Sequence, residues 1–374
     1  MKLIALQKNL KQGVFVSSFL TGKNNNLPIL NNLMISAMGG VIKLLATDLE
    51  VGVTNAIRGK IDKEGSFTVD AKIFSNYINL LPNQKVELEV KDGQLLVESD
   101  NYKTKIKGEA AEEYPLIPEV AKNQHYSVKM EDFKKAVASV LFAVSNDESR
   151  LALSGILFSL EKDGLSLVGT DSYRLAERKV SVKSVGAPEE IKVIVPTKTL
   201  QELVRITSGD YSDEAGGEEI KIYLNDNQIA FNFDSVEIVS RLIDEQYPDY
   251  KQIIPTNFKT NITIDKQELL RAVKAAAIFS KTGINDVNLD FLSAKSNLVI
   301  SATSGQTGES IINLSSKIEG ADNSVTINYK YLIDGLSHID DELVRIEIID
   351  FNSPCLFKPA STKDYLYIIM PIKR

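Results

Sequence analysis

One short pattern occurs three times along this chain of 374 residues. In residues 69–74, 195–200 and 327–332, a β-branched residue and a cap-like or turn residue precede a lysine, and apolar residues then follow at helical spacing. The three copies lie 126 and 132 positions apart. Solenoid repeats are much shorter, at roughly 20–50 residues. The chain is therefore predicted to hold three tandem copies of one domain, and its function is expected to depend on the overall shape that these domains form.

Each copy is predicted to have the same order of elements. The first helices are expected at 6–20, 131–145 and 266–281. The second helices, which carry the shared lysine, are expected at 71–81, 197–208 and 329–338. Strands with alternating apolar residues follow each helix, and turn pairs such as Asp92-Gly93 indicate hairpins. The predicted fold class is α+β, running helix, strands, helix, strands, with domains at 1–123, 124–256 and 257–374.

No catalytic signature emerges from the residues. Asp48 and Asp171 stand at equivalent corners after a strand, but the third copy has Ser304 there, so a backbone-satisfying Asx-type turn is favoured over a metal site. The single cysteine, Cys355, precedes apolar residues and is interpreted as a filler of a strand. The two histidines lie more than 200 positions apart, which supports neither zinc nor a catalytic triad. We predict a non-catalytic protein without metal or cofactor.

The distribution of charge is more informative than its total of -7. The six predicted helices carry a net +7, so the rest of the chain carries -14. If the helices face one way, one surface is basic and attracts phosphate without reading base sequence, while an acidic exterior suppresses binding elsewhere. Lysines on helices are usually only solvated, but their recurrence in three copies favours a DNA-binding surface.

Targeting signals are not recognised in the sequence. Residues 1–8 contain no long apolar run or small-residue cleavage site, which argues against a signal peptide. The apolar stretch 136–144 is far shorter than the roughly 18 residues that span a bilayer. A single cysteine also fits a reducing compartment. We predict a soluble, cytoplasmic protein without a membrane partner.

Several stretches, in order along essentially the whole chain, resemble the bacterial sliding clamp, the beta subunit of the replicative DNA polymerase. They are residues 26–32 (NLPILNN), 46–50 (ATDLE), 113–118 (EYPLIP), 169–176 (GTDSYRLA), 241–250 (RLIDEQYPDY) and 365–374 (YLYIIMPIKR). The resemblance implies a head-to-tail homodimer that closes into a ring, with helices lining the hole and antiparallel sheets outside. Such a ring encircles duplex DNA, independently of sequence, and tethers the polymerase so that rebinding becomes intramolecular.

The resemblance also implies partners and a place where they bind. The partners are the polymerase alpha subunit, the clamp loader, and other polymerases and repair proteins that carry clamp-binding peptides. Carried over by position, the peptide site lies between the second and third domains. Its residues are Leu153, Thr170, Ser172, Tyr173, Arg174, Leu175, Pro248, Ile253, Asn328, Tyr331, Ile368, Met370, Pro371 and Ile372. The family often has Gly, His and Arg where this chain has Ser172, Tyr173 and Gln252, which bears on peptide preference.

Two further sets of residues follow from the resemblance and the charge pattern. The expected DNA contacts are Lys8, Lys11, Lys23, Arg150, Lys198, Arg205, Arg271 and Lys274, of which Lys23 and Arg150 match the family only approximately. The expected subunit interface pairs Ile106, on an edge strand of the first domain, with Ile278 and Phe279 of the third. The alternative function is a repeat-built protein scaffold that does not encircle DNA, which would explain the triplication but not the charge segregation.

Overall fold

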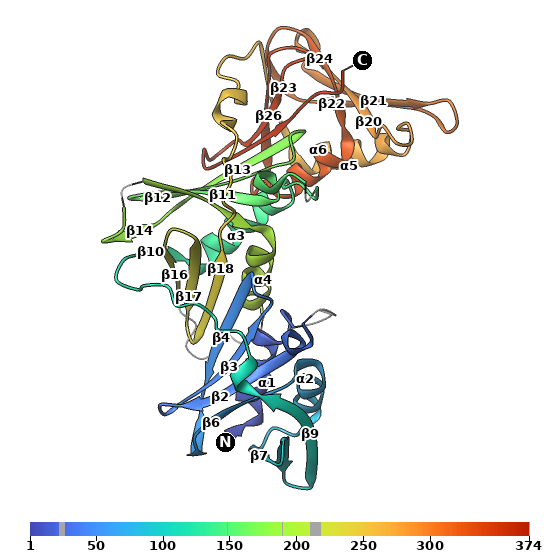
Figure 1. Ribbon diagram of the computed structural model, residues 1–374. Coiled ribbons are helices and arrows are strands. Elements are labelled where there is room, and N and C mark those ends of the chain that lie inside the picture. Colours follow the sequence, from blue (N-terminus) through green and yellow to red (C-terminus); the bar gives the residue numbers. More distant parts are fainter. Residues whose placement is uncertain (22–26, 148, 189, 210–217, 374) are drawn as a thin grey trace. The chain divides into compact units, whose positions relative to one another are not determined.

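The computed structural model describes residues 1–21, 27–147, 149–188, 190–209 and 218–373 (Figure 1). The same order of elements occurs three times: a strand, a helix, five strands, a second helix and three strands. The first repeat consists of β1 (Lys2–Leu6), α1 (Gln7–Ser17), β2 (Asn32–Met38), β3 (Val41–Thr47), β4 (Val51–Ile57), β5 (Gly59–Lys63), β6 (Gly65–Asp70), α2 (Ala71–Leu80), β7 (Lys85–Lys91), β8 (Gln94–Ser99) and β9 (Tyr102–Ala110).

The other two repeats match the first element by element. The second consists of β10 (His125–Lys129), α3 (Met130–Leu141), β11 (Gly155–Glu161), β12 (Gly164–Thr170), β13 (Arg174–Ser181), β14 (Lys183–Val185), β15 (Glu190–Pro196), α4 (Thr197–Thr207), β16 (Glu219–Leu224), β17 (Gln228–Phe233) and β18 (Val236–Arg241). The third consists of β19 (Thr260–Asp265), α5 (Lys266–Ala277), β20 (Asp286–Leu292), β21 (Asn297–Ser304), β22 (Gly308–Ser315), β23 (Lys317–Gly320), β24 (Asn323–Asn328), α6 (Tyr329–Ser337), β25 (Leu343–Ile348), β26 (Cys355–Pro359) and β27 (Tyr365–Ile369).

The six helices occur where the sequence predicts them, with two corrections. Each repeat opens with a strand, β1, β10 or β19, and not with a helix as expected. All six of these helices also end earlier than expected. Because α5 ends at Ala277, Lys281 lies beyond it, and the helices carry one positive charge fewer than the prediction.

The repeated sequence pattern has a local physical cause. Its second residue ends a strand and caps the following helix: the Asp70 carboxylate accepts from Ile73 N at 2.7 Å, and the Asn328 side chain accepts from Lys330 N at 2.9 Å. Such caps satisfy backbone N–H groups that have no partner within the helix. The pattern therefore marks the transitions from β6 to α2 and from β24 to α6, and Pro196 stands at the same place before α4.

The chain forms two compact units, and each contains one boundary between repeats. In the first unit, β4 of the first repeat pairs antiparallel with β18 of the second, with Val53 opposite Ile238. We call this pairing the first junction. It produces a single sheet in the order β14-β10-β16-β17-β18-β4-β3-β2-β6-β9-β8-β7-β1-β5. The first two repeats are thus joined by backbone hydrogen bonds as well as by their linker.

The second unit repeats this construction. Here β13 of the second repeat pairs with β27 of the third, with Ala176 opposite Tyr367, and we call this pairing the second junction. It produces a nine-stranded sheet in the order β15-β11-β12-β13-β27-β26-β25-β19-β23. A separate sheet, β22-β21-β20-β24, completes the third repeat. All strand pairings in both units are antiparallel among the described residues, which confirms the α+β class. No helix in the described part of the chain is long and apolar enough to cross a membrane.

Candidate functional sites

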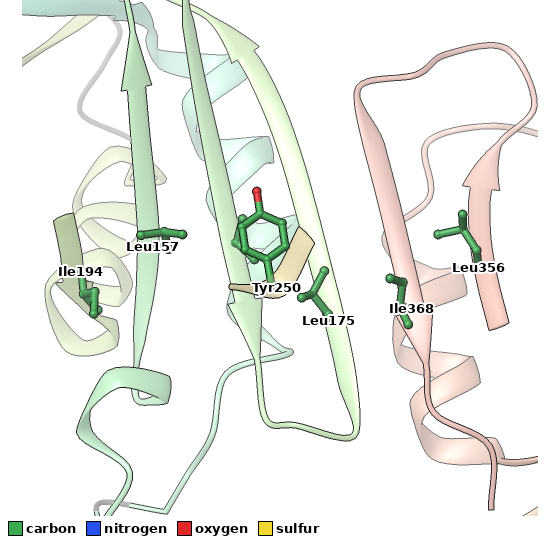
Figure 2. Close-up of a cluster of buried hydrophobic side chains, with 7 residues drawn as sticks. Leu157, Leu175, Ile194, Tyr250, Leu356 and Ile368 are labelled. Atoms are coloured by element: carbon green, nitrogen blue, oxygen red, sulfur yellow. The ribbon is translucent and has the colours of Figure 1, made fainter. Parts of the chain in front are cut away.

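A buried apolar cluster lies on one face of the nine-stranded sheet at the second junction. It contains Leu157, Val168, Leu175, Ile194, Tyr250, Leu356 and Ile368. Figure 2 shows Leu157, Leu175, Ile368 and Leu356 following one another across the strands of two repeats, with Tyr250 beside them. Leu175 and Ile368 stand directly opposite each other on β13 and β27. Two residues of the predicted peptide site are therefore part of the core that joins the second and third repeats.

The Arg174 guanidinium lies at the centre of a polar and aromatic group beside this cluster. Its Nε donates to Asp171 at 3.0 Å, one terminal nitrogen donates to Asp334 at 2.6 Å, and the other donates to the Phe142 carbonyl at 2.8 Å. Its central carbon lies 4.5 Å from the centroid of the Tyr331 ring and 5.4 Å from that of Phe142. Arg174 is thus held by the second repeat and by α6 of the third.

The corner before β13 holds its backbone through its own side chains. Ser172 adopts a left-handed conformation, with φ of 77°. The Thr170 hydroxyl accepts from Ser172 N at 3.2 Å, and one Asp171 oxygen accepts from Tyr173 N and Arg174 N, both at 2.9 Å. These bonds leave the Tyr173 ring projecting from the surface, 59% exposed.

The C-terminal segment is fixed beside this corner by backbone hydrogen bonds. Met370 N donates to Tyr173 O, and Ile372 N donates to Thr326 O, both at 2.8 Å. Met370 and Ile372 are half-buried, as is Pro371 between them. Met370 therefore continues the pairing of β27 with β13 and lies next to the exposed Tyr173, although the two are almost 200 residues apart in the sequence.

The predicted peptide-site residues divide by exposure. The buried ones are Leu153, Thr170, Leu175 and Ile368. The exposed ones are Ser172, Tyr173, Pro248 and Ile253, and the half-buried ones are Arg174, Asn328, Tyr331, Met370, Pro371 and Ile372. The structure brings the corner, Arg174, Tyr331 and Met370 together, whereas the described contacts do not join Pro248 or Ile253 to them. The Asn328 side-chain oxygen caps α6, and Gln252 donates to Asp249 at 2.9 Å.

Sequence reasoning missed three residues that shape this site. Phe142, just beyond the end of α3, stacks on His338, with their ring centroids 4.3 Å apart and their planes 7° from parallel. Asp334, on α6, supplies the second carboxylate to Arg174. These residues lie outside the stretches that carry the resemblance, and they meet Arg174 only through folding. No local signal in the sequence points to them.

The predicted DNA-contact residues have differing surroundings. Lys8, Lys11, Arg271 and Lys274 have exposed side chains on α1 and α5. Lys198 forms an ion pair with Asp48, and Arg150 donates to Ser172 at 3.3 Å. The guanidinium of Arg205 lies between the rings of Phe15 and Phe19. Lys23 falls outside the described residues.

Asp48 and Asp171 each hold the backbone of their own corner. One Asp48 oxygen accepts from Glu50 N at 3.0 Å and from Val51 N at 2.8 Å, while the other meets Lys198. Asp171 likewise accepts hydrogen bonds from the backbone of its own corner and from the Arg174 side chain. The described residues contain no group of three or more His, Cys, Asp or Glu side chains placed to hold a metal ion. The Asx-type turn is the correct interpretation of both corners.

The predicted interface residues also differ in exposure. Ile278 is 69% exposed just after α5, and Phe279 is half-buried. Ile106, by contrast, is only 6% exposed because its side chain packs into the first repeat. Only the backbone of Ile106 is therefore available for contact with another molecule.

Comparison with known proteins identifies the family. Models of the DNA polymerase III beta subunit match at residues 1–118 (N-terminal domain), 127–249 (central domain) and 251–373 (C-terminal domain). The beta sliding clamp of Staphylococcus aureus (strain Mu50) is 30% identical over 358 residues, covering 93% of this chain and 92% of its own. The chain belongs to the bacterial beta sliding clamp family.

Other relatives extend this similarity to the full length. The beta sliding clamp of Synechococcus elongatus is 27% identical over 376 residues, covering 100% of this chain and 99% of its own. Crystal structures of the Bacillus subtilis DNA polymerase sliding clamp and the Thermotoga maritima beta subunit match with TM-scores of 0.93 and 0.91, at 26% and 27% identity. Each covers 100% of this chain and 99% of the other. Membership confirms the predicted function of a DNA clamp, since the family is a non-catalytic processivity subunit.

Proposed function

We propose that two copies of this chain assemble head to tail into a closed ring around duplex DNA. The observation that carries the proposal is that the same junction is built twice within the chain, once in each unit, and that the strands corresponding to its two halves keep largely unpaired edges in the described part of the chain. A third junction of the same kind, formed between copies, would use both. The ring would then tether a polymerase to its template in the bacterial cytoplasm.

Strand edges provide the first half of the support. Each junction pairs the fourth strand of one repeat with the last strand of the next, β4 with β18 and β13 with β27. The corresponding strands that remain are β22 in the third repeat and β9 in the first. In the described part of the chain, β22 pairs only with β21, and β9 pairs on its outer side only from Gly108 to Ala110. Unpaired edges of this kind invite a partner strand.

Exposed helix faces also support the proposed assembly. On α2, Ile73, Tyr77 and Leu80 form an apolar stripe at i, i+4, i+7 spacing, and Leu80 is 80% exposed. The corresponding positions of α4 are the buried residues Thr199, Leu203 and Ile206. Exposed apolar side chains on one copy, with the exposed Ile278 on the other, are suited to an interface between subunits.

The junctions within the chain predict the register between copies. Matching β22 to β4 and β9 to β18 by their hairpin partners places Ser310 opposite Thr104 and Glu309 opposite Lys105. The Glu309–Lys105 pair is complementary in charge, which favours this register. Ile106 then contributes its backbone opposite Gly308.

Engineered cysteines test the dimer. In a chain carrying Thr104→Cys and Ser310→Cys, oxidation should join copies into covalent dimers that are resolved on a non-reducing gel. The native Cys355 will not compete, because it is buried and burial raises its pKa to about 12. The matched control pairs Thr104→Cys with Asn313→Cys, three residues out of register. Equal cross-linking of both pairs, or none of the first, would refute the proposed interface.

Contact with DNA would be electrostatic and loose. The exposed basic residues of α1 and α5, among them Lys11, Arg271 and Lys274, would attract phosphates without reading bases. Topological linkage would hold the protein on DNA, so modest charge suffices for retention. This arrangement permits sliding.

We also propose that short peptides of the polymerase alpha subunit, the clamp loader and other replication and repair proteins dock beside Arg174. Supporting this are the exposed Tyr173, the half-buried Tyr331 and Met370, and the adjoining apolar cluster. A methionine adapts its shape to varied side chains. Because Arg174 is already bonded to two carboxylates and a carbonyl, its part would be to position Tyr331 and the corner.

A further inference from the structure

Arg205, on the last turn of α4, packs its charged guanidinium against the first repeat at the first junction. Its guanidinium donates to the Phe15 and Val16 carbonyls, at 3.0 and 3.2 Å, near the C-terminal end of α1. Its central carbon lies 4.8 Å from the Phe15 ring centroid and 4.6 Å from that of Phe19. Its Nε donates to the buried Glu202 carboxylate at 2.9 Å. One side chain of the second repeat thus meets a helix end, two rings and a carboxylate.

Arg174 makes contacts of the same kinds at the second junction, with a carbonyl near a helix end, aromatic rings and carboxylates, from a different position. It bonds the Phe142 carbonyl just beyond the end of α3, the helix that corresponds to α1. It also lies against the Phe142 ring, and Phe142 corresponds in sequence to Phe19, since the two are separated by the same 123 residues as the first residues of α1 and α3, Gln7 and Met130. Carboxylates of Asp171 and Asp334 balance its charge. Both intrachain junctions therefore place an arginine at the end of the first helix of the preceding repeat.

The chemistry of this position explains the choice of arginine. The last carbonyls of a helix lack partners within the helix and carry the negative end of its dipole. A guanidinium presents several donors in one plane, stays charged and stacks on aromatic rings, whereas an ammonium group provides only a compact charge. A charge that is neutralised by Glu202 and enclosed by two rings is poorly placed to bond a phosphate.

We propose that Arg205 is a positioning residue that fixes α1 against α4 at the first junction, and that it does not contact DNA. Arg174 performs the corresponding task at the second junction. The part of the proposal that concerns DNA rests on the proposed function, whereas the part that concerns the junction does not. Its test therefore has two independent readouts.

The experiment compares full-length Arg205→Ala and Arg205→Lys with Arg271→Ala, which removes an exposed charge from α5. Hydrogen exchange is measured for the last turn of α1, and affinity for a short linear duplex is measured over a range of salt concentrations. We expect both Arg205 variants to speed hydrogen exchange in the last turn of α1 by roughly 10-fold, because losing the bonds to the Phe15 and Val16 carbonyls makes local opening of this turn easier. Lysine should not restore slow exchange, since its ammonium group lacks the planar set of donors that a guanidinium provides.

The salt dependence separates positioning from phosphate contact. Arg271→Ala should reduce the slope of log affinity against log salt by about one unit, the value for one lost phosphate contact, whereas Arg205→Ala should leave the slope unchanged. A slope lowered equally by Arg205→Ala and restored by Arg205→Lys would overturn the proposal, as would unchanged exchange in α1. If Arg271→Ala has no effect while α1 exchange rises, the junction role stands and the proposed DNA surface fails.

Discussion

At the scale of residues, the proposed peptide site at the second junction shares side chains with a buried core. Leu175 and Ile368 are fully buried in the cluster that joins two repeats, while Tyr173 and Met370 lie at its rim. A bound peptide would meet the rim first, and the cluster would act as its floor. Truncation at the rim should therefore affect binding without affecting the join between repeats.

Met370→Ala is expected to weaken binding of a polymerase tail peptide by about 10-fold, or about 1.4 kcal/mol, a loss that truncation of one apolar contact residue can cause. The matched control is Met38→Ala, which removes an exposed methionine from β2. Fluorescence anisotropy with a labelled peptide measures the affinity, and mass in solution checks that both variants remain dimers. Unaltered affinity in Met370→Ala would count against the proposed peptide site.

Tyr114, at the start of the first linker, should make stability depend on alkaline pH. Burial raises the pKa of its hydroxyl to about 12, and that hydroxyl donates to the Asn32 carbonyl at 3.2 Å. The folded state therefore favours the neutral form. The resulting stabilisation is complete below pH 10 and is lost as pH rises through about 12, a change of about 2–3 kcal/mol.

Denaturant unfolding between pH 9 and pH 12 measures this effect. Tyr114→Phe removes the titrating group, so its free energy of unfolding should fall less steeply with pH than that of the natural chain. At neutral pH the variant should lose only about 1 kcal/mol, the usual value of one hydrogen bond. Parallel curves for the two proteins would show that Tyr114 does not titrate in this way.

At the scale of elements, local patterns predicted the helices and the hairpins but not the opening strands. The cap residues Asp70 and Asn328 mark the starts of α2 and α6 clearly in the sequence. The strand β1 runs directly into α1, and Leu6 caps that helix without any side-chain hydrogen bond. An apolar run without a turn signal cannot be divided between strand and helix from its periodicity alone.

The contacts between elements of different repeats were also beyond prediction. Arg205 is predicted from the sequence to contact DNA, and only the fold shows that it lies against Phe15 and Phe19. The peptide-site residues came from the resemblance, whereas Phe142 and Asp334 became apparent only when α3, β13 and α6 met. Periodicity describes one element at a time, so it does not report which ends of distant elements adjoin.

The exposed stripe on α2 should control assembly. Leu80→Glu places a charge in the proposed interface between copies, where it would be desolvated, and should raise the dimer dissociation constant by at least about 10-fold. Analytical ultracentrifugation measures the shift, and circular dichroism verifies folding. Phe351→Glu, which changes another exposed apolar residue, is the control. A Leu80→Glu chain that dimerises as tightly as the control would contradict the helix-face contact.

At the scale of the whole molecule, the triplication explains why no active site is needed. Two junctions within the chain repeat a single geometry, and the proposed third junction between copies would close the repeats into a ring. The separation of basic helices from the acidic remainder of the chain favours DNA binding only if the repeats form a ring with the helices on its inner side. Encirclement is therefore the central claim.

Retention on DNA tests encirclement most directly. The Thr104→Cys, Ser310→Cys chain is assembled on a nicked circular plasmid at low salt, oxidised, and washed at high salt, where charge contacts are screened. Cross-linked protein should stay on the circle and should leave when a restriction enzyme linearises the same DNA. Equal retention on circular and linear DNA after the wash, or complete loss from both, would contradict the ring.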